Sequence, residues 1–296
     1  MRISTTTGGL SETHGYDTAL KMIADAGFDC ADLNLCDMAT NKDCPFLKND
    51  YADFAHKIKA SAEKYGICFN QAHAPYQMNM FKYVEGEEES EKIINLLIRS
   101  IEISGIVGAE NVVVHPVQCF CYHDTDPEEQ LKINVEFYKK LIPAAKKAGV
   151  KIAIENMWRR NQYVQNQISC SVCSSPYELA KYIDECNKIE NCFVACLDIG
   201  HCSLTGHSPA NAIRVLGDRL KALHTHDTDF VHDSHTCPLT MSIPYYEVMA
   251  ALKEINYKGD ITLEAHHFFD KFDESFHHEA LLFMAKVTRH LSTFAE

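Results

Sequence analysis

The sequence predicts an α/β fold, a single (β/α)8 barrel over residues 1–296, and three observations carry this prediction. Eight short, apolar, β-prone segments recur along the chain, and a segment with helical periodicity follows each of them. Such alternation indicates a parallel sheet with right-handed crossovers, and eight is the number of units that closes a barrel. The length of 296 residues suits an α/β barrel, which typically needs about 250 residues.

The strand candidates are rich in Val, Ile, Leu and Phe, and loop-type residues follow each of them. They cover residues 2–7, 28–35, 67–75, 111–116, 151–156, 193–200, 220–227 and 259–266. The helical candidates cover roughly residues 15–26, 51–65, 90–107, 127–148, 176–188, 208–217, 245–256 and 276–294. In the third helix, Ile93, Leu96, Leu97 and Ile101 have the spacing of a helix with one buried face.

Boundary signals agree with these helices. A glycine often ends a helix because it tolerates the left-handed backbone, and five glycines fall between a helical candidate and the next strand: Gly27, Gly66, Gly149, Gly217 and Gly259. Ser175-Pro176 and Ser208-Pro209 are typical of an N-cap followed by proline in the first helical turn.

One domain is expected because no Pro/Gly/Ser-rich linker or abrupt change of composition divides the chain. An open, doubly wound sheet of eight strands is the alternative fold. The segment 5–9, Thr-Thr-Thr-Gly-Gly, is too short to be the glycine-rich phosphate-binding fingerprint of such a sheet.

Composition excludes some classes of function. The formal charge of −13 argues against nucleic acid as a partner, because phosphate contacts need clustered Lys and Arg. No apolar run approaches the ~18 residues that cross a bilayer, so no membrane partner is expected. Thirteen irregularly spaced cysteines and the lack of a signal peptide predict reduced thiols and a cytoplasmic location. Cys170 and Cys173 form a lone C-x-x-C, a weak signal for zinc or redox chemistry.

The strongest functional signal is a metal-binding side chain at the end of four successive strands. These side chains are Glu155, Asp198, His224 and Glu264. In a (β/α)8 barrel the C-terminal ends of the strands share one rim, where active sites lie. A single Glu there is more often an ion-pair partner, and a single His more often a packing residue. Acids gathered at one rim would repel one another without a cation, so the set of four predicts a divalent metal site.

Other polar residues are expected at the same rim. Strand three ends near His73 and strand four near His115, while His201, His226, Asp233, His235 and His266 follow later strands. A mixed carboxylate and imidazole set suits Mn²⁺, Mg²⁺, Co²⁺ or Zn²⁺ rather than a metal selected by soft thiolates.

These motifs resemble the xylose isomerase-like TIM barrel superfamily, which joins sugar isomerases and epimerases, such as the D-tagatose 3-epimerases, to zinc-dependent apurinic-site endonucleases. The segments that carry the resemblance are spread over most of the chain: HAPY (73–76), VVHP (113–116), IEN (154–156), LDIGH (197–201), HTHD (224–227), DSH (233–235) and LE (263–264). They are specific for the superfamily but not for one substrate.

The resemblance implies two ligand arrangements. In the epimerases and isomerases, the counterparts of Glu155, Asp198, His224 and Glu264 hold one divalent ion, often manganese, and the two glutamates move the proton. The counterpart of His201 there contacts the sugar. In the endonucleases up to three zinc ions are held by a larger set, which here would add His73, His115, His201, Asp233 and His235. Metal count stays open, because this chain has suitable residues for both arrangements.

The preferred function is a metal-dependent sugar isomerase or epimerase that transfers a proton next to a carbonyl of a ketose or related polyol. The ion would act as a Lewis acid, and Glu155 and Glu264 would act as catalytic acid and base. Trp158 would form a stacking wall for the sugar, and Arg159 would reach an anionic group. Asp227 would orient His224 or His201, with a loop-capping role as the alternative.

Three other functions are weighed against this one. A metal-dependent lyase or dehydratase on a polyol, or a C-glycoside-cleaving enzyme, is the first alternative. A zinc-dependent apurinic-site endonuclease fits the larger ligand set but not the charge of −13. A non-catalytic role would leave the carboxylate cluster unexplained. A homo-oligomer is expected by analogy with relatives alone.

Overall fold

The computed structural model describes residues 1–76, 86–118, 126–161, 163–164 and 167–296. Its eight-stranded sheet is parallel throughout and has the order β10-β1-β2-β3-β4-β5-β8-β9. These strands are β1 (Ile3–Thr6), β2 (Cys30–Asn34), β3 (Cys68–His73), β4 (Asn111–Val114), β5 (Lys151–Glu155), β8 (Phe193–Asp198), β9 (Leu220–His224) and β10 (Ile261–Leu263). A parallel bridge between Thr225 and Leu263 links the two outer strands, so the sheet forms a nearly closed barrel and confirms the predicted fold.

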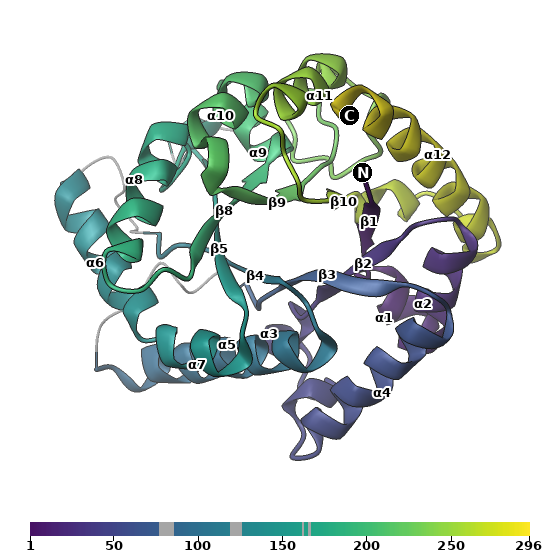
Figure 1. The fold of residues 1–296 in the computed structure, drawn as a ribbon, viewed down its shortest axis with the longest axis horizontal. Helices are drawn as coiled ribbons and strands as arrows, with labels where there is room; N and C mark the ends of the chain where they lie inside the picture. Colours follow the sequence, from purple (N-terminus) through teal and green to yellow (C-terminus); the bar gives the residue numbers. More distant parts are fainter. Residues whose placement is uncertain (77–85, 119–125, 162, 165–166) are drawn as a thin grey trace.

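Helices surround this barrel as an outer ring (Figure 1). They are α1 (Leu10–His14), α2 (Tyr16–Asp25), α3 (Asp37–Thr40), α4 (Tyr51–Lys64), α5 (Glu88–Val107), α6 (Pro127–Lys139), α7 (Ile142–Ala148), α8 (Pro176–Asn187), α9 (Ile199–Leu204), α10 (Pro209–Leu216), α11 (Tyr245–Glu254) and α12 (His277–Ala295). Within the part of the chain that the structure describes, none of these helices is long and apolar enough to span a membrane.

Several predicted elements differ in their bounds from the structure, including the strands predicted over residues 220–227 and 259–266, which are Leu220–His224 and Ile261–Leu263. The helix predicted over residues 127–148 is two helices, α6 and α7, because Pro143 lacks an N–H donor and lies in the first turn of α7. The strand predicted over residues 193–200 ends at Asp198, and α9 begins at the next residue. The sequence also gave no sign of the antiparallel hairpin formed by β6 (Trp158–Arg160) and β7 (Ile168–Cys170).

Most of the predicted helix boundaries are confirmed. Ser208 caps α10 through its side chain, which accepts a hydrogen bond from the Asn211 N–H, and Pro209 follows in the first turn. The backbone of Gly149 has a φ of 72° at the end of α7. Gly259 was wrongly predicted as a left-handed cap. A Cβ there would lie 2.2 Å from the Tyr257 hydroxyl, so close packing requires this glycine.

The barrel interior has an apolar half and a polar half. Small apolar side chains from β4, β5, β8 and β9 pack together in a cluster of their own: Val113, Ala153, Val194, Cys196 and Ala222. On the other side, Ser4 Oγ donates to Asn70 Oδ1 at 2.7 Å, and Asn70 Nδ2 donates to Thr262 Oγ1 at 2.9 Å. These residues come from β1, β3 and β10, which are not all neighbours, so the bonds cross the interior.

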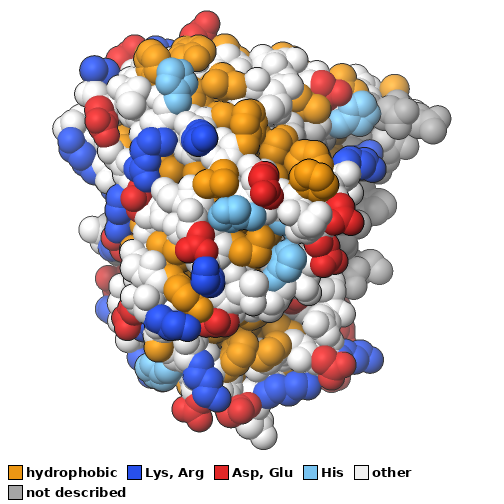
Figure 2. Space-filling view, turned by 90° about the vertical axis from the view of Figure 1, so that its right-hand side faces the viewer, with side chains coloured by type: hydrophobic (Ala, Val, Ile, Leu, Met, Phe, Trp, Pro, Cys, Tyr) orange, Lys and Arg blue, Asp and Glu red, His pale blue; other side chains and the backbone are white. Residues whose placement is uncertain are grey.

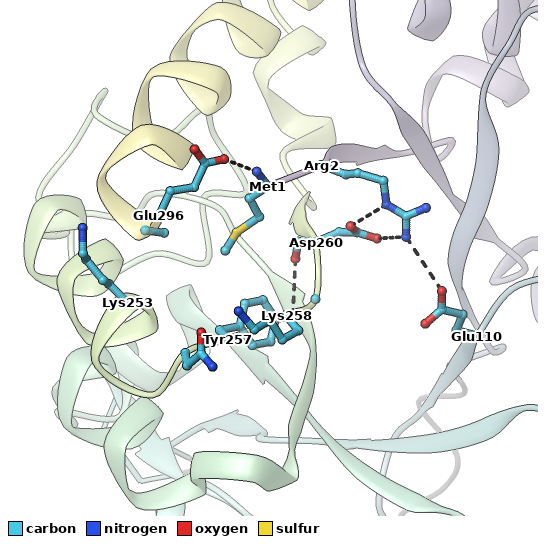
Figure 3. A pocket seen from close by; sticks show the side chains of 11 residues that line it. Met1, Arg2, Glu110, Lys253, Tyr257, Lys258, Asp260 and Glu296 are labelled. Carbon is cyan, nitrogen blue, oxygen red and sulfur yellow. Dashed lines mark hydrogen bonds and ion pairs between the residues drawn. The ribbon is translucent and has the colours of Figure 1, made fainter.

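The opposite rim, at the N-terminal ends of the strands, carries a separate polar cavity of about 630 Å³ (Figure 3). Arg2 forms a two-pronged ion pair with Asp260, with both N···O distances at 2.8 Å, and its guanidinium lies 3.8 Å from Glu110. The Met1 ammonium pairs with Glu296. These contacts tie β1 to β10 and to the last helix, which is a structural role typical of this rim.

The side of α5 that faces the core gives a test of the fold. Leu97 is fully buried, whereas its neighbour Leu96 is only partly buried. Leu97→Ala should lower the free energy of unfolding by about 2–5 kcal/mol, because it removes buried methyl groups and leaves a cavity. Leu96→Ala is the matched control and should cost clearly less. Urea denaturation of both variants measures the difference, and equal losses would contradict the assigned helix face.

Candidate metal centre

The four predicted ligands lie at one rim of the barrel, as the strand ends require. Glu155 ends β5, Asp198 ends β8 and His224 ends β9, and all three side chains are fully buried. Glu264 follows β10. His224 Nδ1 lies 2.7 Å from Glu155 Oε1 and 3.4 Å from Glu264 Oε2. One imidazole nitrogen therefore joins the two carboxylates that were predicted to act in catalysis.

Asp198 has different partners from the other three residues. Its Oδ1 accepts hydrogen bonds from the His201 backbone N–H at 2.7 Å and from His226 Nε2 at 3.1 Å. Its Oδ2 is buried and makes no hydrogen bond with any residue that the structure describes. The first of these bonds caps the N-terminus of α9, so the carboxylate is held by the helix that begins immediately after it.

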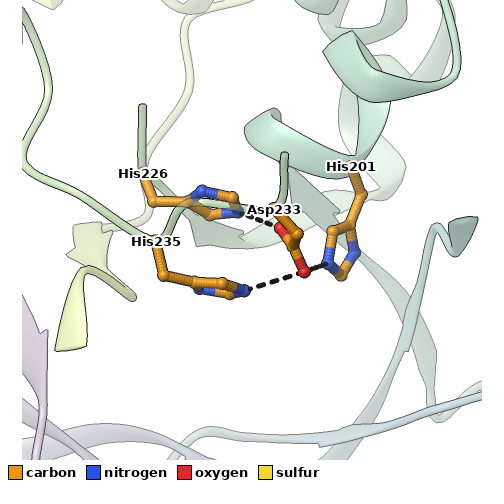
Figure 4. A group of neighbouring side chains, drawn as sticks. All are labelled: His201, His226, Asp233 and His235. Atoms are coloured by element: carbon orange, nitrogen blue, oxygen red, sulfur yellow. Dashed lines mark ion pairs between the residues drawn. The ribbon is translucent and has the colours of Figure 1, made fainter. Parts of the chain in front are cut away.

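A second group of side chains lies beside Asp198 and centres on Asp233 (Figure 4). Asp233 Oδ2 is 3.2 Å from His235 Nε2 and 3.6 Å from His201 Nε2, and Asp233 Oδ1 is 3.7 Å from His226 Nε2. His235 has a φ of 38°, an uncommon left-handed conformation for a residue with a side chain. The loop after β9 thus accepts local strain at the position where His235 joins the group.

A third group lies on the other side of Glu155. His115 Nε2 is 2.7 Å from Glu155 Oε2, and His73 Nε2 is 3.6 Å from the same oxygen. The two Nε2 atoms are 3.1 Å apart. All nine predicted ligands of the larger set are therefore near the same rim. In each of several groups the donor atoms lie within 4.8 Å of one another, about twice a metal–ligand bond.

Electrostatics around Glu155 favour an ionised carboxylate beside a neutral His115 imidazole. Burial raises the pKa of the Glu155 carboxyl, but the neighbouring His224 and His115 outweigh it and hold that pKa well below its ordinary value. Burial lowers the pKa of His115, which stays below its ordinary value despite Glu155. A neutral imidazole is the form that binds a cation, so His115 is suited to do so.

In and beside the second group, charged neighbours also shift the pKa values of buried side chains. Burial raises the pKa of Asp198, but His201 and His226 outweigh it and bring that pKa to about 2. Burial lowers the pKa of His235, and the Asp233 and Glu264 carboxylates reverse this effect and raise it to about 9. Burial raises the pKa of Asp233, but His201 and His235 outweigh it and hold that pKa well below its ordinary value. Asp198 and Asp233 are therefore ionised near neutral pH, and among the described residues neither Asp198 Oδ2 nor Asp233 Oδ1, both buried, has a hydrogen-bond partner.

These residues fit a divalent cation. Buried polar atoms are almost always satisfied in native proteins, so unpartnered carboxylate oxygens amid imidazoles require an explanation. Carboxylate and imidazole donors are the ligands that Mn²⁺, Co²⁺ and Zn²⁺ accept. Glu155, His224 and Glu264 would hold one ion with Asp198, and the second and third groups offer donors for further ions.

Asp32 in β2 is a site residue that the sequence analysis missed. It is fully buried, and its Oδ2 lies 3.4 Å from His224 Nε2, the nitrogen on the side away from Glu155. Gln71 Nε2 donates to the same oxygen at 3.1 Å. An acidic residue within a predicted strand was the available signal, but it lies one layer below the strand ends that carry the other ligands.

A cavity of about 630 Å³ opens above the three groups. Glu155, Glu264, His201 and His235 line it, whereas the fully buried Asp198 and His224 do not. Trp158 and Arg159, on the β6–β7 hairpin, form part of its wall. Trp158 Nε1 donates to Asp233 Oδ2 at 3.1 Å, which ties this wall to the second group.

Two predicted features lie elsewhere. The Asp227 carboxylate does not line the cavity and accepts hydrogen bonds from the backbone N–H groups of Thr228, Met241 and Ile243. These bonds match the loop-capping alternative, while the carboxylate near His224 is that of Asp32. Cys170 donates to the Thr205 carbonyl, and Cys173 packs into the hydrophobic core, so the two thiols have separate surroundings.

The raised pKa of His235 gives a test by pH. In the chelator-treated protein, its contribution to stability is complete below pH 6.5 and is lost as pH rises through about 9, because the folded state then releases the proton. The free energy of unfolding should therefore fall over this range, and less steeply in His235→Gln. With Mn²⁺ the trend should reverse, since metal ligands must be deprotonated. Urea denaturation across this pH range measures the free energy of unfolding of wild type and of His235→Gln. The same dependence on pH in both proteins would contradict the raised pKa of His235.

Asp32 gives a second test. Asp32→Asn and Asp32→Leu should weaken Mn²⁺ binding by about 10- to 100-fold, because His224 Nε2 loses the carboxylate 3.4 Å away that would accept its proton when Nδ1 binds the cation. Asp260→Asn removes a buried carboxylate at the opposite rim and should leave affinity unchanged. Isothermal titration calorimetry measures the Mn²⁺ affinity of all three variants. Wild-type affinity in the Asp32 variants would show that Asp32 does not support the metal centre.

Comparison with known proteins places this chain in a family. The chain is 27% identical over 195 residues to an uncharacterized protein of Methanocaldococcus jannaschii, an alignment that covers 65% of this chain and 62% of that protein, less than two thirds of its length. The structure of the present chain is similar to that of a D-tagatose 3-epimerase-like protein. The TM-score is 0.75, the identity is 19%, and the alignment covers 100% of this chain and 98% of the other.

Two further solved structures share the fold. One is a D-psicose 3-epimerase in the presence of D-fructose, with a TM-score of 0.73, 16% identity and 99% coverage of each chain. The other is the 3-keto-D-glucoside 4-epimerase from E. coli, with a TM-score of 0.72, 16% identity and coverage of 97% and 99%. The model of the xylose isomerase-like TIM barrel family matches residues 20–281, and the chain therefore belongs to that family.

Proposed function

We propose that the protein is a divalent-metal-dependent isomerase or epimerase of a sugar or related polyol. The observation that carries this proposal is the meeting of Glu155 and Glu264 at His224 Nδ1, at 2.7 and 3.4 Å, on the floor of a cavity that both glutamates line. Two carboxylates from different strands at one cavity can take a proton from a carbon and return one to it.

The cation would be held by Glu155, Asp198, His224 and Glu264. When bound, it would supply Lewis-acid stabilisation to a carbonyl and a neighbouring hydroxyl oxygen of the substrate. Mn²⁺, Zn²⁺, Mg²⁺ and Co²⁺ all suit this donor set, and the second and third groups would accommodate up to three ions in all.

The two glutamates differ in access. The Glu264 side chain is 16% exposed, whereas the Glu155 side chain is 1% exposed and contacts two histidines at 2.7 Å. Glu264 is therefore better placed to remove the proton next to the carbonyl, with Glu155 returning it. Return to the same carbon gives epimerisation, and return to the neighbouring carbon gives isomerisation.

Residues of the cavity wall would position the sugar. His201 Nε2 faces Asp233 at 3.6 Å and lines the cavity, where it would orient a hydroxyl group. Trp158 offers a flat apolar face, which suits stacking on a sugar ring. Arg159 lines the same wall and would contact an anionic or polar group of the substrate.

The names of similar structures support a sugar substrate. The D-psicose 3-epimerase and the D-tagatose 3-epimerase-like protein share this fold over nearly the whole chain. Because a fold hosts many functions, this likeness supports the proposal only together with the carboxylate pair. We also propose a single barrel domain over residues 1–296, a cytoplasmic location and a homo-oligomer.

Zinc-dependent cleavage of abasic DNA is the second candidate, because all nine residues of the larger ligand set gather at the rim. Charge opposes it: the chain carries −13, and on the face in Figure 2 the Lys and Arg side chains are interspersed with Asp and Glu. A polyol lyase, dehydratase or C-glycoside-cleaving reaction would use the same cation and base.

Proton exchange tests the proposal. The Mn²⁺-loaded enzyme should incorporate deuterium from D2O into a free ketose at the carbon next to the carbonyl, as measured by NMR over a panel of ketoses. Chelator should abolish exchange, and Glu264→Gln should lower its rate by about 10²-fold or more, because it removes a base. Glu110→Gln, at the opposite rim, is the matched control and should exchange normally.

Other outcomes assign a different function. Loss of water from a cyclic polyol without exchange into any ketose would favour the lyase. Cleavage of abasic DNA by a protein with three zinc ions per chain would favour the nuclease. Asp198→Asn should reduce metal content as well as exchange, and full metal content would remove Asp198 from the ligand set.

A further inference from the structure

We propose that His226 is a positioning residue that fixes the Asp198 carboxylate for metal binding, and that Gly200 is required because the His226 ring occupies the space of its side chain. The inference rests on the metal centre of the proposed function and assigns a role to two residues of the HTHD and LDIGH segments. Three observations support it: the hydrogen bonds of Asp198, the packing of Gly200 and the confinement of the ring.

The first observation is the unequal use of the two Asp198 oxygens. Oδ1 accepts from the His201 N–H at 2.7 Å and from His226 Nε2 at 3.1 Å, whereas buried Oδ2 has no hydrogen-bond partner in the described part of the chain. Two donors on one oxygen fix both the position and the rotation of the carboxylate. Oδ2 is thereby left as the atom that is able to bind a cation.

The second observation is the close approach of the His226 ring to Gly200. A Cβ at position 200 would lie 2.0 Å from His226 Cε1, 2.3 Å from Nε2 and 2.6 Å from Nδ1. Real Cβ atoms do not approach other heavy atoms so closely, so the backbone at Gly200 forms one wall of the ring's site. Gly200 is the second residue of α9, two positions after Asp198.

The third observation is the confinement of the ring on its other side. The His235 ring stacks on it with centroids 4.0 Å apart and planes 16° apart. The Tyr245 hydroxyl donates to the His226 carbonyl at 2.7 Å and anchors the backbone, and the residue is fully buried. Held between Gly200 and His235, the ring cannot turn its Nε2 away from Asp198 without displacing one of them.

His226 also lies near Asp233, with Nε2 3.7 Å from Oδ1, so direct metal binding by His226 is the competing role. The shorter contact favours positioning, because Nε2 donates to Asp198 and a nitrogen that carries a proton cannot bind a cation. The two roles predict different losses: a positioning residue sets the affinity of the Asp198 ion, and a ligand sets the number of ions bound.

The experiment is a double-mutant cycle on the full-length, chelator-treated protein. Gly200→Ala, His226→Ala and the double variant are titrated with Mn²⁺ by calorimetry, and Co²⁺ absorption spectra report the ligand geometry. Each single variant should bind Mn²⁺ about 10- to 100-fold more weakly. The double variant should be no weaker than His226→Ala alone, because the added methyl then has space. His226→Gln keeps an N–H donor and should lie between wild type and His226→Ala.

A matched control separates this effect from general disruption. Gly105→Ala places a Cβ 2.8 Å from Ala148, at the C-terminal ends of the outer helices α5 and α7 and therefore at the end of the barrel opposite the site. It should lower the melting temperature but leave Mn²⁺ affinity and the Co²⁺ spectrum unchanged. If Gly200→Ala fails to fold, the two His226 variants still test the hydrogen bond.

The binding data can overturn the proposed positioning role of His226 in two ways. Wild-type affinity in His226→Gln and His226→Ala, or additive losses in the double variant, would overturn the inference. Fewer ions bound at unchanged affinity would make His226 a ligand and also overturn it. If the cycle behaves as expected but no ketose exchanges deuterium, the positioning role stands and the proposed function fails. If the wild-type protein binds no divalent ion, both fail.

Discussion

The contact between His224 and Glu155 is the interaction on which the centre depends. A buried carboxylate is costly unless a positive partner offsets the loss of water. Glu155 is surrounded by His224, His115 and His73, which lie at the ends of three different strands. Its ionised form therefore depends on the observed strand order, and a shift in any of these strands would remove one of the three histidine contacts.

The polar half of the barrel interior serves the same interaction. TIM barrels commonly fill this space with branched apolar side chains. Here a run of hydrogen bonds links Ser4, Asn70 and Thr262, and Gln71 holds Asp32 beneath His224. Such a network is stable only when its members are satisfied, and in that state it specifies one arrangement of side chains. The polar layer below the site thus orients the side chains above it, while the apolar half of the interior supplies close packing.

Much of the fold and part of the site were predictable from the sequence. Strand–helix alternation is a strong local signal, and strand ends in a parallel barrel share one rim, so Glu155, Asp198, His224 and Glu264 were placed together. Their partners were not predictable, because contacts across the barrel depend on the register of strands that are not neighbours. His226 was assigned no role at first, although it faces Asp198, and Asp32 was hidden within a strand. The break between α6 and α7 was not predicted, although Pro143, which lacks an N–H donor, was the available signal.

The β6–β7 hairpin has a consequence for the adaptability of this protein. Its Trp158 donates to Asp233 Oδ2, the oxygen that also faces His201 and His235. In many barrels, loops that select the ligand vary freely above a constant chemical centre. Here the hairpin donates a hydrogen bond to Asp233 itself, so exchanging the hairpin would also disturb the imidazoles around Asp233. Divergence toward new ligands in this lineage would therefore require paired changes in both segments.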